Sequence, residues 1–220
     1  MSGSTGNAHR RRYDATGRRA KAARTRLAVI DASYRVFVQR GYGGATIPLI
    51  AAEAGVSVET VYRAAPGKAG LLAAAVQAAL AGGAERAERP VEERGAIARV
   101  IAEPDPRRVI ELYAASQPGL WSRTGPLLRV LDAAAVSEPA LIGLQQQLAE
   151  QRRHGQGRLA DQLHGMGALR ADLPVERARD IVWTLCAQAT FDALVTSCGW
   201  AHSDYAQWLA RMLTAALLEP

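Results

Sequence analysis

Alanine is the residue that most constrains the fold of this chain, because it fills 44 of the 220 positions. Alanine has the highest intrinsic helix propensity, whereas strands favour β-branched and aromatic residues. The chain has only two phenylalanines, and its β-branched residues form no long runs. The sequence therefore predicts an all-α protein with about nine to ten helices.

Charge divides the chain into two parts of opposite sign. Residues 1–72 hold 12 Lys+Arg against 4 Asp+Glu, a net charge of +8, and residues 73–220 hold 15 against 17, a net charge of −2, which together give +6. Eight of the basic residues fall within the first 26 positions. This basic arm favours a polyanion, nucleic acid before acidic lipid, and it also suits a solubilising tail.

Several protein classes lack support in the sequence. The N-terminus has no apolar stretch of the secretory kind, and the Ala/Leu-rich segment 69–81 is too short to span a bilayer. Cys186 and Cys198 are too far apart for a CxxC motif, and the four histidines lack metal-ligand spacing. No HExxH, P-loop or GxSxG motif occurs. We expect a soluble cytoplasmic protein with no catalytic residues, metal, cofactor or membrane partner.

Apolar periodicity and helix-terminating residues divide the chain into three segments. Residues 1–20 lack periodicity and are expected to form a disordered basic arm. Residues 21–82 form a small N-terminal domain, with helices predicted at residues 22–40, 47–54, 58–64 and 68–82. Residues 83–220 form a larger domain, with helices predicted at residues 106–117, 126–136, 139–164, 174–197 and from a Ser203 cap onward.

Two short helices joined by a tight turn carry most of the functional information. Thr46 is predicted to cap the first helix and Ser57 the second. Ala51 is small enough to let the helices cross closely, and Gly55 supplies the positive φ that the turn needs. Val61 holds the second helix against the first. This is helix-turn-helix spacing, although helical corners of this kind also occur for packing alone.

The second helix then presents its remaining side chains outward, in position for a major groove. Lys68 begins the next helix, where its ammonium group and nearby backbone N–H groups suit a phosphate. The predicted DNA-binding residues are Thr46, Ser57, Val58, Glu59, Thr60, Tyr62, Arg63, Lys68, Arg24 and Arg26.

Residues 26–72 resemble the N-terminal domain of TetR-family transcriptional regulators. The matching positions are Phe37, Gly41-Tyr42, Ala45-Thr46, Ile50-Ala51, Ala54-Gly55-Val56-Ser57, Thr60-Val61-Tyr62, Pro66-Gly67-Lys68 and Leu71-Leu72. Two positions depart from the family pattern: Ala64, where His or Tyr is frequent, and Ala65, where Phe is nearly invariant. The second departure removes an aromatic side chain between the recognition helix and the next helix.

The resemblance implies a homodimer whose two recognition helices enter successive major grooves of a pseudo-palindromic operator. It places Thr46, Tyr62 and Lys68 on phosphates. It places Val58, Glu59 and Thr60 on bases, which suits their chemistry, since valine meets a thymine methyl, glutamate accepts from cytosine N4 and threonine pairs with several base edges.

Two of these residues have structural alternatives. Glu59 also stabilises the first helical turn through the helix dipole, by about 0.3–1 kcal/mol. Tyr62 is alternatively a core aromatic residue.

The larger domain carries weaker signals. The resemblance implies a four-helix dimer interface, to which we assign Phe191, Tyr205, Trp208, Met212 and Leu213. The candidate effector-binding residues are Leu112, Tyr113, Trp121, Leu128, Leu131, Leu144 and Trp183, with Gln117, Gln145 and Arg152 as polar contacts. Each of them is alternatively plain core.

We therefore expect a ligand-responsive dimeric transcriptional regulator, a repressor, that a small and largely apolar effector releases from DNA. One alternative is a helix-turn-helix regulator without a ligand, which a C-terminal core without a cavity would favour. Another is a ligand-binding or catalytic helical bundle whose basic N-terminus is incidental.

Overall fold

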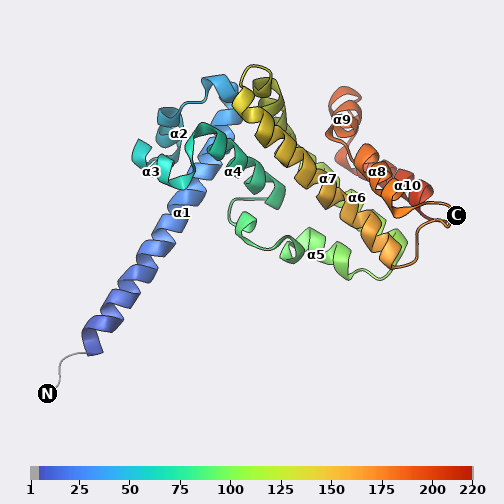
Figure 1. Cartoon of the computed structure of the whole chain (residues 1–220), viewed down its shortest axis with the longest axis horizontal. Coiled ribbons are helices and arrows are strands. Elements are labelled where there is room, and N and C mark those ends of the chain that lie inside the picture. The colour runs from blue at the N-terminus through green and yellow to red at the C-terminus, as the bar shows by residue number, and fades with distance from the viewer. Residues whose placement is uncertain (1–4, 220) are drawn as a thin grey trace.

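The computed structural model describes the backbone of residues 5–219 and the side chains of residues 20–219. Within this part the chain forms ten α-helices and no strand, with one isolated bridge between Leu169 and Leu218 (Figure 1). The prediction of an all-α fold with a small N-terminal domain and a larger helical domain is confirmed. No single helix in the described range is long and apolar enough to cross a membrane. The bent pair α3–α4, defined below, meets that criterion by length and composition alone.

The N-terminal domain contains four helices, α1 (Thr5–Gly44), α2 (Ile47–Ala54), α3 (Val58–Ala64) and α4 (Gly67–Ala81). Its helix ends lie close to the predicted positions. Gly41 adopts φ 65° and ψ 177° and so interrupts α1 where the first predicted helix ends. Gly55 and Gly82 are left-handed and terminate α2 and α4.

The start of α1 differs from the prediction. We expected residues 1–20 to be disordered, but α1 already begins at Thr5, and its N-terminal half extends away from the rest of the molecule (Figure 1). Extending a formed helix costs far less than nucleating one, and alanine and arginine are good helix formers. The helix therefore continues toward the N-terminus without an apolar stripe. Residues 1–4 lie outside the described part of the chain.

The small residue Ala65 lies close to a second small residue, Gly70. Ala65 is buried, with 8% of its surface exposed. A Cβ added to Gly70 would lie 2.8 Å from Cδ of Pro66 and 3.7 Å from Cβ of Ala65. Gly70 therefore packs closely on Pro66, one turn earlier at the start of α4, and lies beside Ala65.

The larger domain contains α5 (Gly95–Ala102), α6 (Pro106–Ala135), α7 (Ile142–Gly165), α8 (Val175–Leu185), α9 (Gln188–Phe191) and α10 (His202–Leu217). Short 3-10 segments lie at Arg86–Glu88, Val91–Glu93 and Pro139–Leu141, and a π-helical segment follows α9 at Asp192–Ser197. Helix α6 is central, since it packs against α1, α4, α5, α7 and α10 (Figure 1).

Helix α6 corrects the prediction that prolines divide this region into two helices. Pro118 and Pro126 both lie inside one continuous helix. An internal proline costs about 3 kcal/mol, because it removes a hydrogen bond and crowds the preceding turn. Thirteen residues of α6 are buried, and burial of each large apolar side chain contributes roughly 1.5–3 kcal/mol. Burial along the whole helix therefore outweighs two local penalties.

The helix predicted at residues 174–197 is also divided differently. Helix α8 ends at Leu185, Cys186 has φ −89° and ψ 14°, and Ala187 is extended before α9 begins. No glycine or proline marks this break. The Cys186 carbonyl instead accepts a hydrogen bond from Gln156 Nε2 of α7, at 3.0 Å. The last helix begins at His202, with Ala201 rather than Ser203 as its N-cap.

Candidate functional site

The α2–α3 corner is held by local hydrogen bonds on both sides of the turn. The Leu49 N–H donates to Thr46 Oγ1 and the Thr60 N–H to Ser57 Oγ, both at 3.3 Å. Both caps therefore form as predicted. Between them Gly55 has φ 66°, a conformation that L side chains rarely adopt. Val61 is fully buried and fixes which face of α3 points inward.

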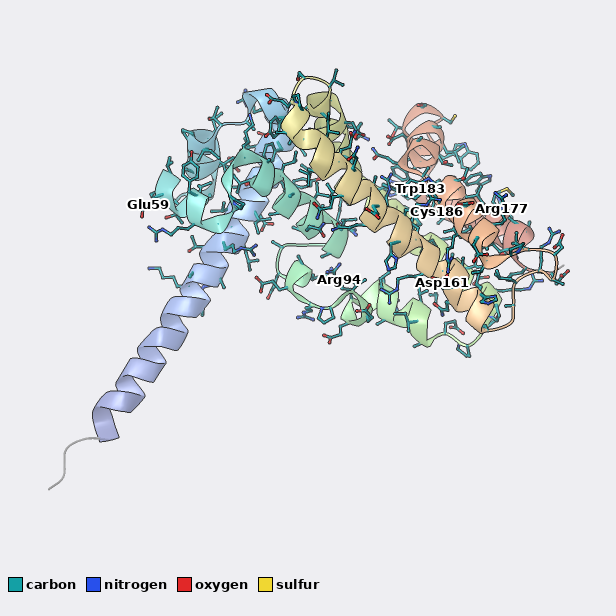
Figure 2. All side chains as sticks on the ribbon, in the orientation of Figure 1. Glu59, Arg94, Asp161, Arg177, Trp183 and Cys186 are labelled. Carbon is teal, nitrogen blue, oxygen red and sulfur yellow. The ribbon has the colours of Figure 1, made fainter. Side chains whose placement is uncertain are left out.

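The opposite face of α3 is open to solvent. Val58 is 40% exposed and Tyr62 is 58% exposed, so Tyr62 is not a core aromatic residue. Glu59 and Arg63 are also exposed, and Glu59 lies at the outer edge of the domain (Figure 2). Thr60 is half-buried, and its hydroxyl lies 2.9 Å from that of Ser57. The predicted recognition residues thus lie together on one short, outward-facing helix.

Glu59 is paired within the helix. Its Oε1 accepts a hydrogen bond from Nη2 of Arg63 at 2.6 Å, one turn later. An exposed pair of this kind contributes only about 0.3–0.5 kcal/mol, so it opens at little cost when a base or phosphate offers a better partner. The pair also reduces the electrostatic penalty of bringing a carboxylate near DNA.

Lys68 lies at the start of α4, where its ammonium group packs on an aromatic ring. Its Nζ is 4.1 Å from the ring centroid of Tyr42, and that ring stacks on Phe37 with 6.0 Å between centroids. These contacts restrict the Lys68 side chain at the domain surface. Arg24 is exposed, and Arg26 lies 3.7 Å from Glu88. The side chains of the basic residues before position 20 lie outside the described part.

A groove of about 550 Å³ lies between the two domains. Its walls come from the end of α1, including Tyr42, and from α6 and the following turn, including Pro126, Arg129 and Glu138. Burial, and secondarily the charge of Glu138, raises the pKa of Tyr42. Tyr42 therefore touches both Lys68 and the junction between the domains. Sequence reasoning assigned it no role, because only the fold brings it to this position.

The seven apolar effector candidates lie in the helical core of the larger domain. Tyr113, Trp121, Leu128 and Leu131 are buried, and Leu112, Leu144 and Trp183 are half-buried. None of the seven lines the interdomain groove. Their assignment to an effector site remains a prediction, and the packing of these side chains also suits plain core.

The polar candidates differ from one another. Gln145 Nε2 donates to Asp132 at 2.7 Å. Gln117 is buried, and its Oε1 has no hydrogen-bond partner among the described residues. The guanidinium of Arg152 lies 4.7 Å from the ring centroid of Trp183 and 5.7 Å from that of Trp121, and burial lowers its pKa.

Sequence reasoning missed three polar residues of this core. The sequence analysis gives Gln156 and Cys186 no role in a site, and it places Tyr205 at the dimer interface. Burial raises the pKa of the Cys186 thiol to about 12 and also raises the pKa of Tyr113 and Tyr205. One signal was available in the sequence, since Gln156 follows Arg152 by four residues and therefore lies on the same helical face.

The five residues assigned to the dimer interface separate into two groups. Phe191, Tyr205 and Leu213 are buried within a single chain, where Phe191 and Tyr205 pack edge to face at 5.2 Å. They have little or no surface left for a partner, so their predicted contact across the interface needs correction. Trp208 is half-buried and Met212 is 37% exposed, and both remain accessible.

Comparisons with known proteins agree with this architecture. Residues 29–75 match the family model described as bacterial regulatory proteins, tetR family. No curated protein matches the chain. Within the described residues no group of three His, Cys, Asp or Glu side chains is arranged to hold a metal ion.

Solved structures share the fold of the whole chain at low sequence identity. A protein described as a TetR-family transcriptional regulator from Mesorhizobium loti has a TM-score of 0.67 and 17% identity, covering 88% of this chain and 95% of its own. The transcriptional regulator FadR from Bacillus subtilis, in complex with stearoyl-CoA, has a TM-score of 0.65 and 16% identity, covering 85% and 96%. NalD from Pseudomonas aeruginosa, the secondary repressor of the MexAB-OprM multidrug efflux pump, has a TM-score of 0.65 and 17% identity, covering 90% and 98%.

Together, the sequence match and the fold matches cover both domains of the chain. The sequence match falls on the capped corner and the outward-facing helix, and the fold match continues through the larger domain. The TetR family consists of DNA-binding transcription factors rather than enzymes. Residues 29–75 are a TetR-family helix-turn-helix domain, in a chain that has the fold of TetR-family transcriptional regulators.

Proposed function

We propose that this protein is a dimeric, ligand-responsive transcriptional repressor that binds a pseudo-palindromic operator and leaves it when a small, largely apolar effector binds. The observation that carries this proposal is the α3 geometry. Val61 is completely buried while Val58 and Tyr62 on the other face are 40% and 58% exposed. A short helix fixed by one face and open on the other suits insertion into a major groove.

The exposed residues divide into two roles. Thr46, Tyr62 and Lys68 contact phosphates and set the affinity, supported by Arg24 and Arg26. Val58, Glu59 and Thr60 face base edges and set the sequence preference, with Ser57 and Arg63 beside them. The stacking of Lys68 on Tyr42 supports its role, since a restricted cation loses less side-chain freedom when it binds a phosphate.

Contacts between the two domains support coupling of the effector to DNA. Arg123 Nε of α6 donates to the Ala79 carbonyl of α4 at 3.1 Å, and Gln77 Nε2 of α4 donates to Gln151 of α7 at 2.8 Å. Since Lys68 lies at the other end of α4, a shift of α6 on effector binding moves the DNA-binding surface. The two recognition helices then leave the spacing of about 34–36 Å that successive grooves require.

The dimer places α10 against the partner through its accessible side chains. Trp208 and Met212 lie four residues apart on α10 and so share one face. Two proteins of similar fold support the proposal of a ligand-responsive repressor, since FadR is described in complex with stearoyl-CoA and NalD is described as a repressor.

A regulator without a ligand is the second candidate. It is favoured by the dense packing of the seven effector candidates, four of which are buried. The two candidates differ in one respect, since only the first predicts that a small molecule changes DNA affinity.

Selection of bound genomic fragments, followed by mobility-shift titration of the selected duplex, tests the proposal. We expect sub-micromolar binding by a dimer and at least 100-fold weaker binding to a scrambled duplex of equal length. Equal binding to both duplexes would refute operator recognition.

A further inference from the structure

The core of the larger domain holds buried polar atoms without partners. Gln117 Oε1 and Gln156 Oε1 make no hydrogen bond among the described residues, and both side chains are at least 95% buried. Trp121 Nε1 and Tyr205 Oη are buried as well, and these two groups interact with each other, which lowers the pKa of Tyr205 against the larger effect of burial. A buried donor or acceptor left unpaired costs about 1–3 kcal/mol. Such atoms are rare in proteins and usually have a functional cause or a missing partner.

These atoms belong to one region. On the buried face of α6, Trp121 follows Gln117 by one turn. On α7, Gln156 follows Arg152 by one turn. Arg152 touches the rings of Trp121 and Trp183, and Gln156 binds the Cys186 carbonyl. Trp183 and Cys186 lie near one another on and just after α8, beside α7 (Figure 2).

Arg152 lacks an anionic partner. It forms no hydrogen bond and no ion pair within 4.0 Å in the described part of the chain, although burial disfavours its charge. The charge of Asp132 raises the pKa of Arg152, but the Asp132 carboxylate accepts its hydrogen bond from Gln145 instead. By contrast the adjacent Arg153 is exposed and lies 3.0 Å from Asp180. A guanidinium offers planar paired donors that match a carboxylate, and a single positive charge balances one carboxylate rather than a phosphate dianion.

We infer that this core is an effector site closed in the ligand-free state, and that it recognises an apolar carboxylic acid whose carboxylate pairs with Arg152. The inference rests on the proposed function and specifies the chemistry of its effector. The Gln117 and Gln156 oxygens accept from any hydroxyl on the ligand. The surrounding tryptophan and leucine side chains contact the apolar body.

The break after α8 provides a way to open this site. Cys186 and Ala187 leave the helical conformation without glycine or proline, and a π-helical segment follows at Asp192–Ser197. π-helical segments interrupt regular helix hydrogen bonding and frequently lie at functional sites. Movement of α9 away from α6 therefore requires little loss of regular helix.

Calorimetric titration of the full chain with two carboxylates, 2-naphthoate and octanoate, and their neutral amides tests the inference. We expect at least one carboxylate to bind ten times more tightly than its amide. Arg152→Gln removes this preference, whereas the matched control Arg153→Gln keeps it. Equal binding of acid and amide, a preference that survives Arg152→Gln, or no binding of either carboxylate would overturn the inference.

A second variant separates a ligand site from ordinary hydration of the core. Gln117→Leu is expected to leave the melting temperature of the free protein unchanged or higher, while removing any gain in affinity that 8-hydroxyoctanoate shows over octanoate. A lower melting temperature with unchanged binding would assign Gln117 to structure and contradict its role. Mobility-shift titration of the same preparations separates failure of the proposed function from failure of this inference. Loss of operator binding refutes the proposed function. Intact operator binding without a preference for the carboxylate refutes only this inference.

Discussion

Replacing Lys68 by methionine isolates the charge of one phosphate contact, because methionine keeps an unbranched apolar stem. Lys68 Nζ lies 4.1 Å from the Tyr42 ring centroid at the surface of α4, with no carboxylate paired to it among the described residues. A dimer carries two copies, and each neutralised phosphate contributes about 0.9 to the slope of log affinity against log salt. The variant should therefore flatten the slope by about 1.8.

The slope predicts how the two proteins diverge with salt. Between 50 and 200 mM salt the advantage of the natural protein over the variant should shrink by about 12-fold, since the salt concentration rises fourfold at a slope difference of about 1.8. Fluorescence anisotropy with the selected operator measures both slopes, and Arg108→Met, far from α3 on α6, provides a matched control. An unchanged slope, or a loss confined to one base pair of the operator, would refute a phosphate contact by Lys68.

Three further predictions test the packing. Val61→Ala should lower the free energy of unfolding by roughly 1.5–3 kcal/mol, because Val61 is fully buried. Tyr62→Ala should weaken operator binding with little change in stability, because Tyr62 is exposed. Equal melting curves for both variants would contradict the assigned faces of α3. Trp208→Glu should yield monomers in sedimentation analysis with poor operator binding, and an unchanged dimer would remove α10 from the interface. At pH 8 a thiol reagent should label only the exposed Cys198 in the native protein, because burial raises the pKa of Cys186 to about 12 and keeps it neutral; rapid labelling of two thiols would show that its core is open.

The buried Cys186 also has a consequence for alkaline stability. Its folded-state pKa is raised above that of the unfolded chain, so the unfolded state releases its proton first as the pH rises. The contribution of the neutral thiol to stability is complete below the unfolded value near 8.5 and is lost progressively toward pH 12.

The helix-turn-helix could be predicted from the sequence because its determinants are local. Thr46, Gly55 and Ser57 each act on residues within one turn, and the structure places both caps and the left-handed glycine where expected. Pro118 shows the opposite case, since its local penalty is visible in the sequence and the burial that outweighs it depends on the whole fold. The break at Cys186 likewise coincides with a hydrogen bond from Gln156, thirty residues away.

The same distinction limits the prediction of the sites. An apolar stripe on α10 indicates that a surface is covered, but it does not identify which element covers it. Tyr205 and Leu213 pack inside their own chain, whereas Trp208 and Met212 remain accessible on the same helix. The unpartnered Arg152 could not be recognised either, because the absence of an acidic neighbour is a property of three-dimensional packing.

Chemical probing of guanine N7 on the selected operator tests most directly whether paired α3 helices read successive major grooves. We predict that the bound protein protects guanines in two half-sites whose centres lie about 10–10.5 base pairs apart, and that substitution of Val58, Glu59 and Thr60 by alanine removes this protection. Protection of a single half-site, or protection that persists in the substituted protein, would contradict this prediction.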